Sequence, residues 1–111
     1  MITKEDMKAF QDYSDWVEDK IVTNPKDRLV ENTLGLMGEA GEVAEKIKKR
    51  IRDNTKVEPE EIVKELGDVI FYATALSNFY GASLGITIAE NMMKLDGRQA
   101  RGTIKGSGDE R

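Results

Sequence analysis

The sequence predicts an all-α fold in which one domain is built from four helices. Apolar residues recur every three or four positions along four stretches, turn-forming residues separate these stretches, and strand-like alternation never persists over four to eight residues. A chain of 111 residues supplies enough apolar surface for one core and leaves no material for a second. We therefore expect a four-helix bundle, or half of a larger one.

The first helix is predicted over residues 4–21. Thr3 and Asp6 form a capping-box pattern at its start, and Pro25 follows the end of its apolar periodicity. The second helix is predicted over residues 28–52, where apolar side chains cover about half of the circumference.

The third helix is predicted over residues 59–81 and the fourth over residues 84–96. Pro59 occupies a favoured first helical position, and Ser83 is a suitable N-cap for the fourth helix. The helical domain is accordingly expected to span residues 1–97.

Residues 98–111 form a glycine-rich, basic segment with almost no apolar content. Such a segment is typical of a disordered tail, and its positive charge would equally suit a lid over the phosphates of a substrate. Both interpretations remain open from the sequence.

The composition excludes several kinds of chemistry. The chain has no cysteine and no histidine, which excludes disulfides, thiol nucleophiles, cysteine or histidine zinc sites and imidazole acid-base catalysis. A net charge of -4 argues against wide nucleic-acid binding, and the uncharged stretch over residues 69–85 is too polar for a membrane span. Without a secretory leader, a cytoplasmic location is expected.

Four carboxylates in two predicted helices are the strongest candidates for a functional site. Glu39 and Glu42 share one face of the second helix, and Glu65 and Asp68 share one face of the third. The surrounding sequences, E-A-G-E-V and E-L-G-D-V, resemble each other, and antiparallel pairing would bring the four side chains together. Because like charges about 5 Å apart repel by about 3 kcal/mol per pair at an effective dielectric near 20, the cluster requires bound cations or raised pKa values. All-oxygen ligands favour Mg²⁺, with Mn²⁺ as the alternative.

The non-functional interpretation is that the second helix carries a solvated acidic face, in which Glu42 would pair with Lys46. Against it stand Gly35, Gly38 and Gly41, since glycine inside a helix costs about 1 kcal/mol relative to alanine. We therefore expect another helix or a ligand to approach this face closely. The carboxylates of the third helix open onto an apolar stripe and have no evident counter-charge.

The motifs resemble those of the MazG-like all-α nucleoside triphosphate pyrophosphohydrolases. The resemblance lies in G-E-A-G-E-V-A-E at 38–45, in E-L-G-D-V-I-F-Y at 65–72 and in the 22 residues that separate Glu42 from Glu65. It extends over about residues 30–111. One departure is Gly38, where larger members often have an additional glutamate.

The resemblance implies Mg²⁺-dependent hydrolysis of a nucleoside triphosphate to the monophosphate and pyrophosphate, by a homodimer or homotetramer. It further implies that Asn91, Lys94 and Arg98 contact phosphates. Independently of the resemblance, Trp16 and Tyr13 of the first helix are candidates for stacking on a base, although large aromatic residues at helical spacing are more often part of a core.

Two alternatives remain. A phosphoribosyl-ATP pyrophosphohydrolase shares the fold and the acidic motifs, and a non-catalytic helical interaction module would use the apolar stripe of the third helix as a partner groove.

Overall fold

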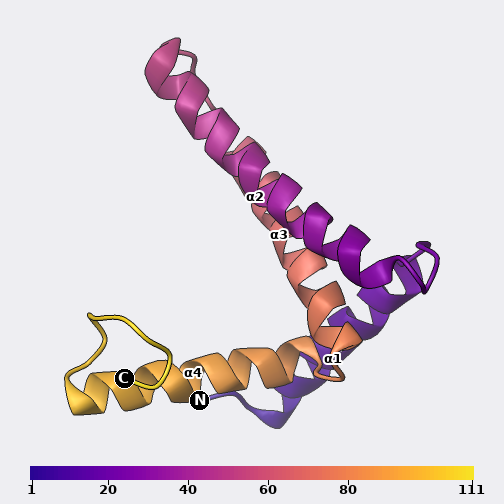
Figure 1. Cartoon of the computed structure of the whole chain (residues 1–111), viewed down its shortest axis with the longest axis vertical. Helices are drawn as coiled ribbons and strands as arrows, with labels where there is room; N and C mark the ends of the chain where they lie inside the picture. The colour runs from indigo at the N-terminus through magenta and orange to yellow at the C-terminus, as the bar shows by residue number, and fades with distance from the viewer.

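The structure, a computed structural model, describes residues 1–111 and contains four helices and no strand (Figure 1). They are α1 (Lys4–Lys20), α2 (Arg28–Arg52), α3 (Pro59–Phe79) and α4 (Leu84–Arg101). The all-α prediction is confirmed, and the bounds of the first three helices agree with it within two residues.

Helix α4 runs further than the sequence suggested, because the predicted end near residue 96 is not a stop. Gly97 lies inside the helix, and the chain leaves it at Gly102, which adopts a left-handed conformation with φ of 72°. Such a conformation is easy for glycine and ends many helices. The predicted domain boundary after residue 97 therefore falls within a continuous helix.

The helix starts are capped as predicted. The Thr3 hydroxyl accepts a hydrogen bond from the Asp6 main-chain N–H at 3.0 Å, and the Asp6 carboxylate accepts one from the Thr3 N–H at 3.0 Å. The Ser83 hydroxyl accepts a hydrogen bond from the Ile86 N–H at 3.3 Å. These bonds satisfy main-chain donors that a helix leaves free in its first turn.

The four helices form two arms rather than a closed bundle. Helices α2 and α3 lie side by side and antiparallel along one arm, while α1 and α4 meet near the far end of α3 (Figure 1). Helix α2 packs along α3 and not along α1 or α4. The closed four-helix bundle, one of the two arrangements expected from the sequence, is therefore not formed within one chain.

No single helix is long and apolar enough to cross a membrane. Only α3 and α4 taken together meet such a criterion of length and composition, and they are bent by 96° at the break between them.

A polar junction fixes α1 against the base of the α2–α3 arm. The Arg28 guanidinium donates to both carboxylate oxygens of Glu18 and, at 3.1 Å, to the main-chain oxygen of Ala75. The Asn78 amide donates to the main-chain oxygen of Ser14 at 3.0 Å. The hydrogen bonds from Arg28 hold the pKa of Glu18 below its ordinary value. Together these contacts tie three helices at one point.

The chain buries few apolar side chains. Val17 and Ala75 are the fully buried ones, and the radius of gyration is 16.6 Å, against about 13 Å for a compact domain of this length. The core is thus confined to the junction, and the arms leave large apolar side chains open.

Candidate active site

Three carboxylates from two helices converge on one point of the α2–α3 arm. One oxygen each of Glu39, Glu65 and Asp68 lies within 4.8 Å of the other two. Glu39 and Glu65 are half-buried, whereas Asp68 is exposed. A cation with oxygen ligands at about 2.0 to 2.6 Å could contact all three after small adjustments of the side chains.

The convergence follows from the register of the two helices. The ring of Tyr72 rests on Gly35, where a Cβ atom would lie only 2.6 Å from Tyr72 Cζ. Four residues further along α2 is Glu39, and four residues back along α3 is Asp68. Because antiparallel helices rise equally per residue, the contact between Gly35 and Tyr72 brings Glu39 level with Asp68.

The expected close approach therefore exists at Gly35, where the neighbour is a helix of the same chain. At Gly38, Gly41 and Gly67 a Cβ would meet no atom within 4 Å. The glycines beside the acidic residues thus face open space, which is room for a ligand or another chain.

Glu42 lies outside the group of converging oxygens. It is exposed, one turn beyond Glu39 on α2, and its charge is still felt at Glu39. Of the four predicted ligands, the structure brings three together and leaves the fourth at the edge.

The electrostatics of the cluster act most strongly on Glu39. Burial raises the pKa of its carboxyl group above the ordinary value, and a hydrogen bond with Glu65 and the charges of Asp68, Glu65 and Glu42 raise it further. Each cause disfavours the ionised form. The surroundings of Glu39 therefore favour the protonated form of its carboxyl group.

Lys46 supplies a counter-charge that the sequence did not reveal. Its Nζ lies 3.9 Å from a carboxylate oxygen of Glu65, and both side chains are about three-quarters buried. The sequence suggested instead that Lys46 pairs with Glu42 along α2 and that the carboxylates of α3 lack a partner, and this expectation was wrong. The long side chain of Lys46 reaches across the helix interface, where the negative charge is more concentrated.

An aromatic group on α1 lies beside the cluster. Tyr13 and Trp16 stack with ring centroids 5.7 Å apart, and Phe71 of α3 meets the Trp16 ring edge-on at 6.1 Å. Burial, first, and the charge of Asp68 raise the pKa of Tyr13. Trp16 nevertheless remains 50% exposed, so the indole is neither a core side chain nor fully open.

The predicted phosphate-binding residues lie on another part of the molecule. Asn91, Lys94 and Arg98 belong to α4, which turns away from α3 and does not pack on α2 (Figure 1). Asn91 and Lys94 are exposed, whereas Arg98 is buried. Within one chain, these residues and the carboxylates form two separate groups.

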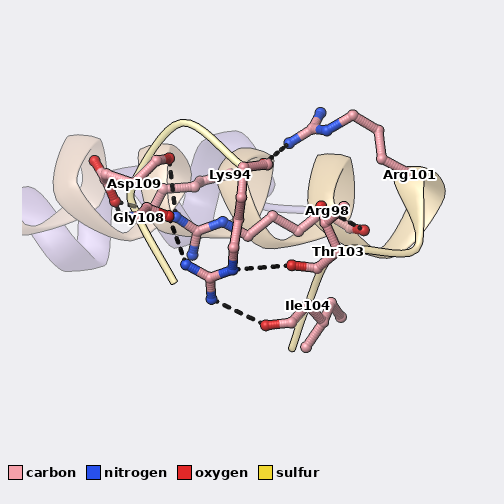
Figure 2. Close-up of polar contacts among 8 residues, drawn as sticks. Lys94, Arg98, Arg101, Thr103, Ile104, Gly108 and Asp109 are labelled. Atoms are coloured by element: carbon pink, nitrogen blue, oxygen red, sulfur yellow. Dashed lines mark hydrogen bonds and ion pairs between the residues drawn. The ribbon is translucent and has the colours of Figure 1, made fainter. Parts of the chain in front are cut away.

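The segment after α4 folds back along the helix. Asp109 binds Lys94 at 3.0 Å and Arg98 at 3.1 Å, and neither contact could be anticipated from the sequence (Figure 2). In the structure this segment lies on α4 of its own chain and not over the carboxylates.

The chain is similar in sequence to known proteins. The sequence model of the MazG nucleotide pyrophosphohydrolase domain matches residues 29–102, a range that contains all four acidic residues. A relative, the Gene 37 protein of Mycobacterium phage L5, is 43% identical over 83 residues, which cover 71% of this chain and 73% of that protein. No solved structure matches the chain.

Proposed function

The chain belongs to the MazG nucleotide pyrophosphohydrolase family, and from this premise we propose that it hydrolyses a nucleoside triphosphate to the monophosphate and pyrophosphate in the presence of Mg²⁺. The family acts on nucleotides and depends on metal ions. One observation carries the proposal for this chain: oxygens of three of the four predicted ligands, Glu39, Glu65 and Asp68, lie within 4.8 Å of one another.

The donor set fits a hard divalent cation. Carboxylate oxygens without histidine or cysteine suit Mg²⁺ or Mn²⁺, and Mg²⁺ commonly keeps several waters and shares its remaining positions with substrate phosphates. Burial, first, and the neighbouring carboxylates raise the pKa of Glu39, and a bound cation would favour its ionised form. We assign Glu65 and Asp68 as ligands, Glu39 as a ligand or general base, and Glu42 as a further ligand, which a change of side-chain rotamer would bring in.

Water is the proposed nucleophile, because the proposed reaction is a hydrolysis and the chain contains no cysteine or histidine that would form a covalent intermediate. When bound, the metal ion would lower the pKa of a coordinated water and neutralise charge on the phosphate oxygens. Glu39 either binds the metal or accepts the proton of the attacking water, since a base works best when its pKa approaches the working pH. Lys46, next to Glu65, restrains that carboxylate and limits the repulsion within the cluster.

The aromatic pair on α1 suits the base of the nucleotide. The half-exposed ring of Trp16 is supported from behind by Tyr13 and from the edge by Phe71. A supported, partly open indole can stack on a purine or pyrimidine at a small cost in side-chain entropy. We therefore propose that the base lies on Trp16 while the phosphates face the carboxylates.

A second copy of the chain completes this proposal. The chain exposes 8184 Å², about 2,000 Å² more than a compact monomer of 12.4 kDa exposes. Much of the open apolar surface lies on the α2–α3 arm, where Val30, Leu34, Met37 and Val63 are each more than half exposed. An excess of this size per chain matches the area that permanent dimers bury. We propose that two or four chains associate through this arm, and that α4 of one chain brings Asn91, Lys94 and Arg98 to the carboxylates of another.

The proposed function is tested with a panel of nucleoside triphosphates and phosphoribosyl-ATP, scored for pyrophosphate release with Mg²⁺ and with a chelator. Glu65→Gln and Asp68→Asn should each lower kcat by at least about 100-fold, because each removes a charged ligand while keeping the shape of the side chain. Glu60→Gln is the matched control, since Glu60 is an exposed acidic residue of the same helix outside the cluster. Wild-type turnover by folded Glu65→Gln would refute the assignment.

The oligomeric state is tested by light scattering over a dilution series. Association through the arm predicts a mass of at least two chains, and Leu34→Glu should lower that mass because it introduces a charge into the apolar contact. A strictly monomeric wild-type protein would contradict this part of the proposal.

A further inference from the structure

Two cations of α4 hold an anion that belongs to the chain itself. One carboxylate oxygen of Asp109 accepts hydrogen bonds from Lys94 Nζ at 3.0 Å and from Arg98 Nη2 at 3.1 Å. The main-chain oxygen of Asp109 accepts a further bond from Arg98 Nη2 at 3.0 Å. Figure 2 shows Asp109 beside Lys94 and Arg98, where two oxygens of one residue take the place that two oxygens of a phosphate would occupy.

Asp109 satisfies only part of the hydrogen-bonding capacity of Arg98. The Arg98 side chain is only 6% exposed, and its Nε is buried without a hydrogen-bond partner. The oxygens of Asp109 reach Nη2 alone, whereas a phosphate group commonly binds a guanidinium through two parallel N–H groups. Because a buried unpaired donor is unfavourable, an anion that also reaches Nε binds Arg98 better than Asp109 does.

The segment that carries Asp109 is held in shape by other contacts. Arg111 donates to the main-chain oxygens of Thr103 at 3.0 Å, Gly108 at 2.6 Å and Ile104 at 2.9 Å. Arg101 donates to the main-chain oxygen of Arg111 at 2.7 Å. The loop is therefore ordered largely without Asp109, and the carboxylate is delivered to the two cations at a small entropic cost.

We propose that Asp109 is an intramolecular competitor of substrate phosphate, which occupies Lys94 and Arg98 until a nucleotide displaces it. The proposal rests on the proposed function in that it takes the displacing anion to be a polyphosphate. The Asp109 side chain is 75% exposed, so water can enter and the contact can open. The hydrogen bond from Lys94, first, and that from Arg98 lower the pKa of Asp109, so the competitor remains charged at neutral pH.

While Asp109 occupies Lys94 and Arg98, the apparent affinity of the protein for phosphate is lowered. A polyphosphate binds only the fraction of chains in which Asp109 has left the two cations, so its apparent affinity falls by that fraction. Since exposed ion pairs are individually weak, the effect of removing Asp109 is expected to be about threefold to tenfold.

The test measures the binding of inorganic tripolyphosphate to the whole metal-free protein by calorimetry. Asp109→Asn should bind it about threefold to tenfold more tightly than the wild type. Glu110→Gln is the matched control, because Glu110 is a neighbouring acid of equal charge that forms no ion pair, and its affinity should stay nearest to that of the wild type. An unchanged affinity in Asp109→Asn would overturn the proposal. So would a weaker one, which would instead make Asp109 a residue that positions Lys94 and Arg98.

Limited trypsin digestion supplies a second readout. Lys105 is exposed in the folded-back segment, and docking of this segment on α4 through Asp109 limits the local opening that cleavage requires, so displacement of Asp109 should speed cleavage after Lys105. Tripolyphosphate should accelerate this cleavage in the wild type, and Asp109→Asn should be cleaved rapidly with or without it. Cleavage after Lys105 that does not respond to tripolyphosphate would overturn the proposal. Neither assay contains a metal ion or a nucleotide, so both outcomes are independent of whether the protein releases pyrophosphate.

Discussion

Replacing Glu39 by glutamine should stabilise the metal-free protein and at the same time weaken its response to Mg²⁺. Glu39 faces two acidic residues, Glu65 and Asp68, with oxygens within 4.8 Å. At this separation each pair of charges repels by about 3.5 kcal/mol at an effective dielectric near 20 and by about 0.9 kcal/mol in bulk water. The site is partly open to solvent, and Lys46 offsets part of the charge of Glu65. A net gain of about 1 to 3 kcal/mol is therefore expected for the substitution.

The pH dependence of this gain follows from the direction of the pKa shift. The pKa of Glu39 is raised in the folded protein, so the folded state binds more protons than the unfolded state between the two pKa values. Its ionisation thus destabilises the fold. This loss of folding free energy is absent below the ordinary pKa of glutamate, grows as the pH rises, and is complete above the raised pKa of Glu39 in the folded protein. The advantage of Glu39→Gln should accordingly be present at pH 7.5 and disappear as the pH falls below about 4.

Thermal unfolding with and without Mg²⁺ measures both effects. A gain of 1 kcal/mol corresponds to a rise in Tm of about 5 °C for a domain of this size. Mg²⁺ at 100 times its Kd should stabilise the wild type by about 2.7 kcal/mol, and Glu39→Gln by less because a ligand is missing. Glu60→Gln, measured at the same protein concentration, controls for the loss of one negative charge. If metal-free Glu39→Gln unfolds below the wild type at pH 7.5, or if its gain persists at pH 3.5, the repulsion argument fails.

Two further substitutions probe the packing and the aromatic pair. Gly35→Ala should lower the free energy of unfolding, measured by chemical denaturation, by about 1 to 3 kcal/mol, because the added methyl group overlaps the Tyr72 ring. The methyl group of Gly38→Ala would meet no atom of the chain, so the same measurement should show no loss or a gain. Equal effects of the two would contradict the assigned register. Trp16→Ala should raise KM for a nucleoside triphosphate by about tenfold, the loss of one stacking contact, while Trp16→Phe keeps most of the affinity. An unchanged KM in Trp16→Ala would remove the indole from the substrate site.

The helices could be predicted from the sequence because periodicity and caps are local signals. Thr3, Pro59 and Ser83 marked three starts correctly. The end of α4 could not be predicted, because Gly97 and Gly102 are equally plausible stops by composition and the fold-back contacts of residues 103–111 favour the second.

The candidate site could be predicted in outline, since two similar acidic motifs on antiparallel helices must face each other somewhere. Which carboxylates actually meet depends on rotamers and on the interface, so the exclusion of Glu42 and the pairing of Lys46 with Glu65 were beyond the sequence. The ion pairs of Asp109 were equally out of reach, because they join residues 11 and 15 positions apart through a loop without regular structure.

Gly35, three residues before the first acidic motif, explains how a site built on only two helices stays assembled. A slip of one turn between α2 and α3 would move Glu39 about 5.4 Å away from Asp68, and no loop between the ligands could compensate. The notch at Gly35 receives the ring of Tyr72 and opposes such a slip, since any larger side chain would overlap the ring. The neighbour of Gly35 is Tyr72 and not a carboxylate, yet the distances among Glu39, Glu65 and Asp68 depend on this contact. Gly35→Ala should therefore weaken Mg²⁺ binding as well as stability. Ser14→Ala removes the buried hydroxyl that accepts a hydrogen bond from the Leu84 N–H at 2.8 Å, away from the carboxylates, and should lower stability while leaving the Mg²⁺ affinity unchanged.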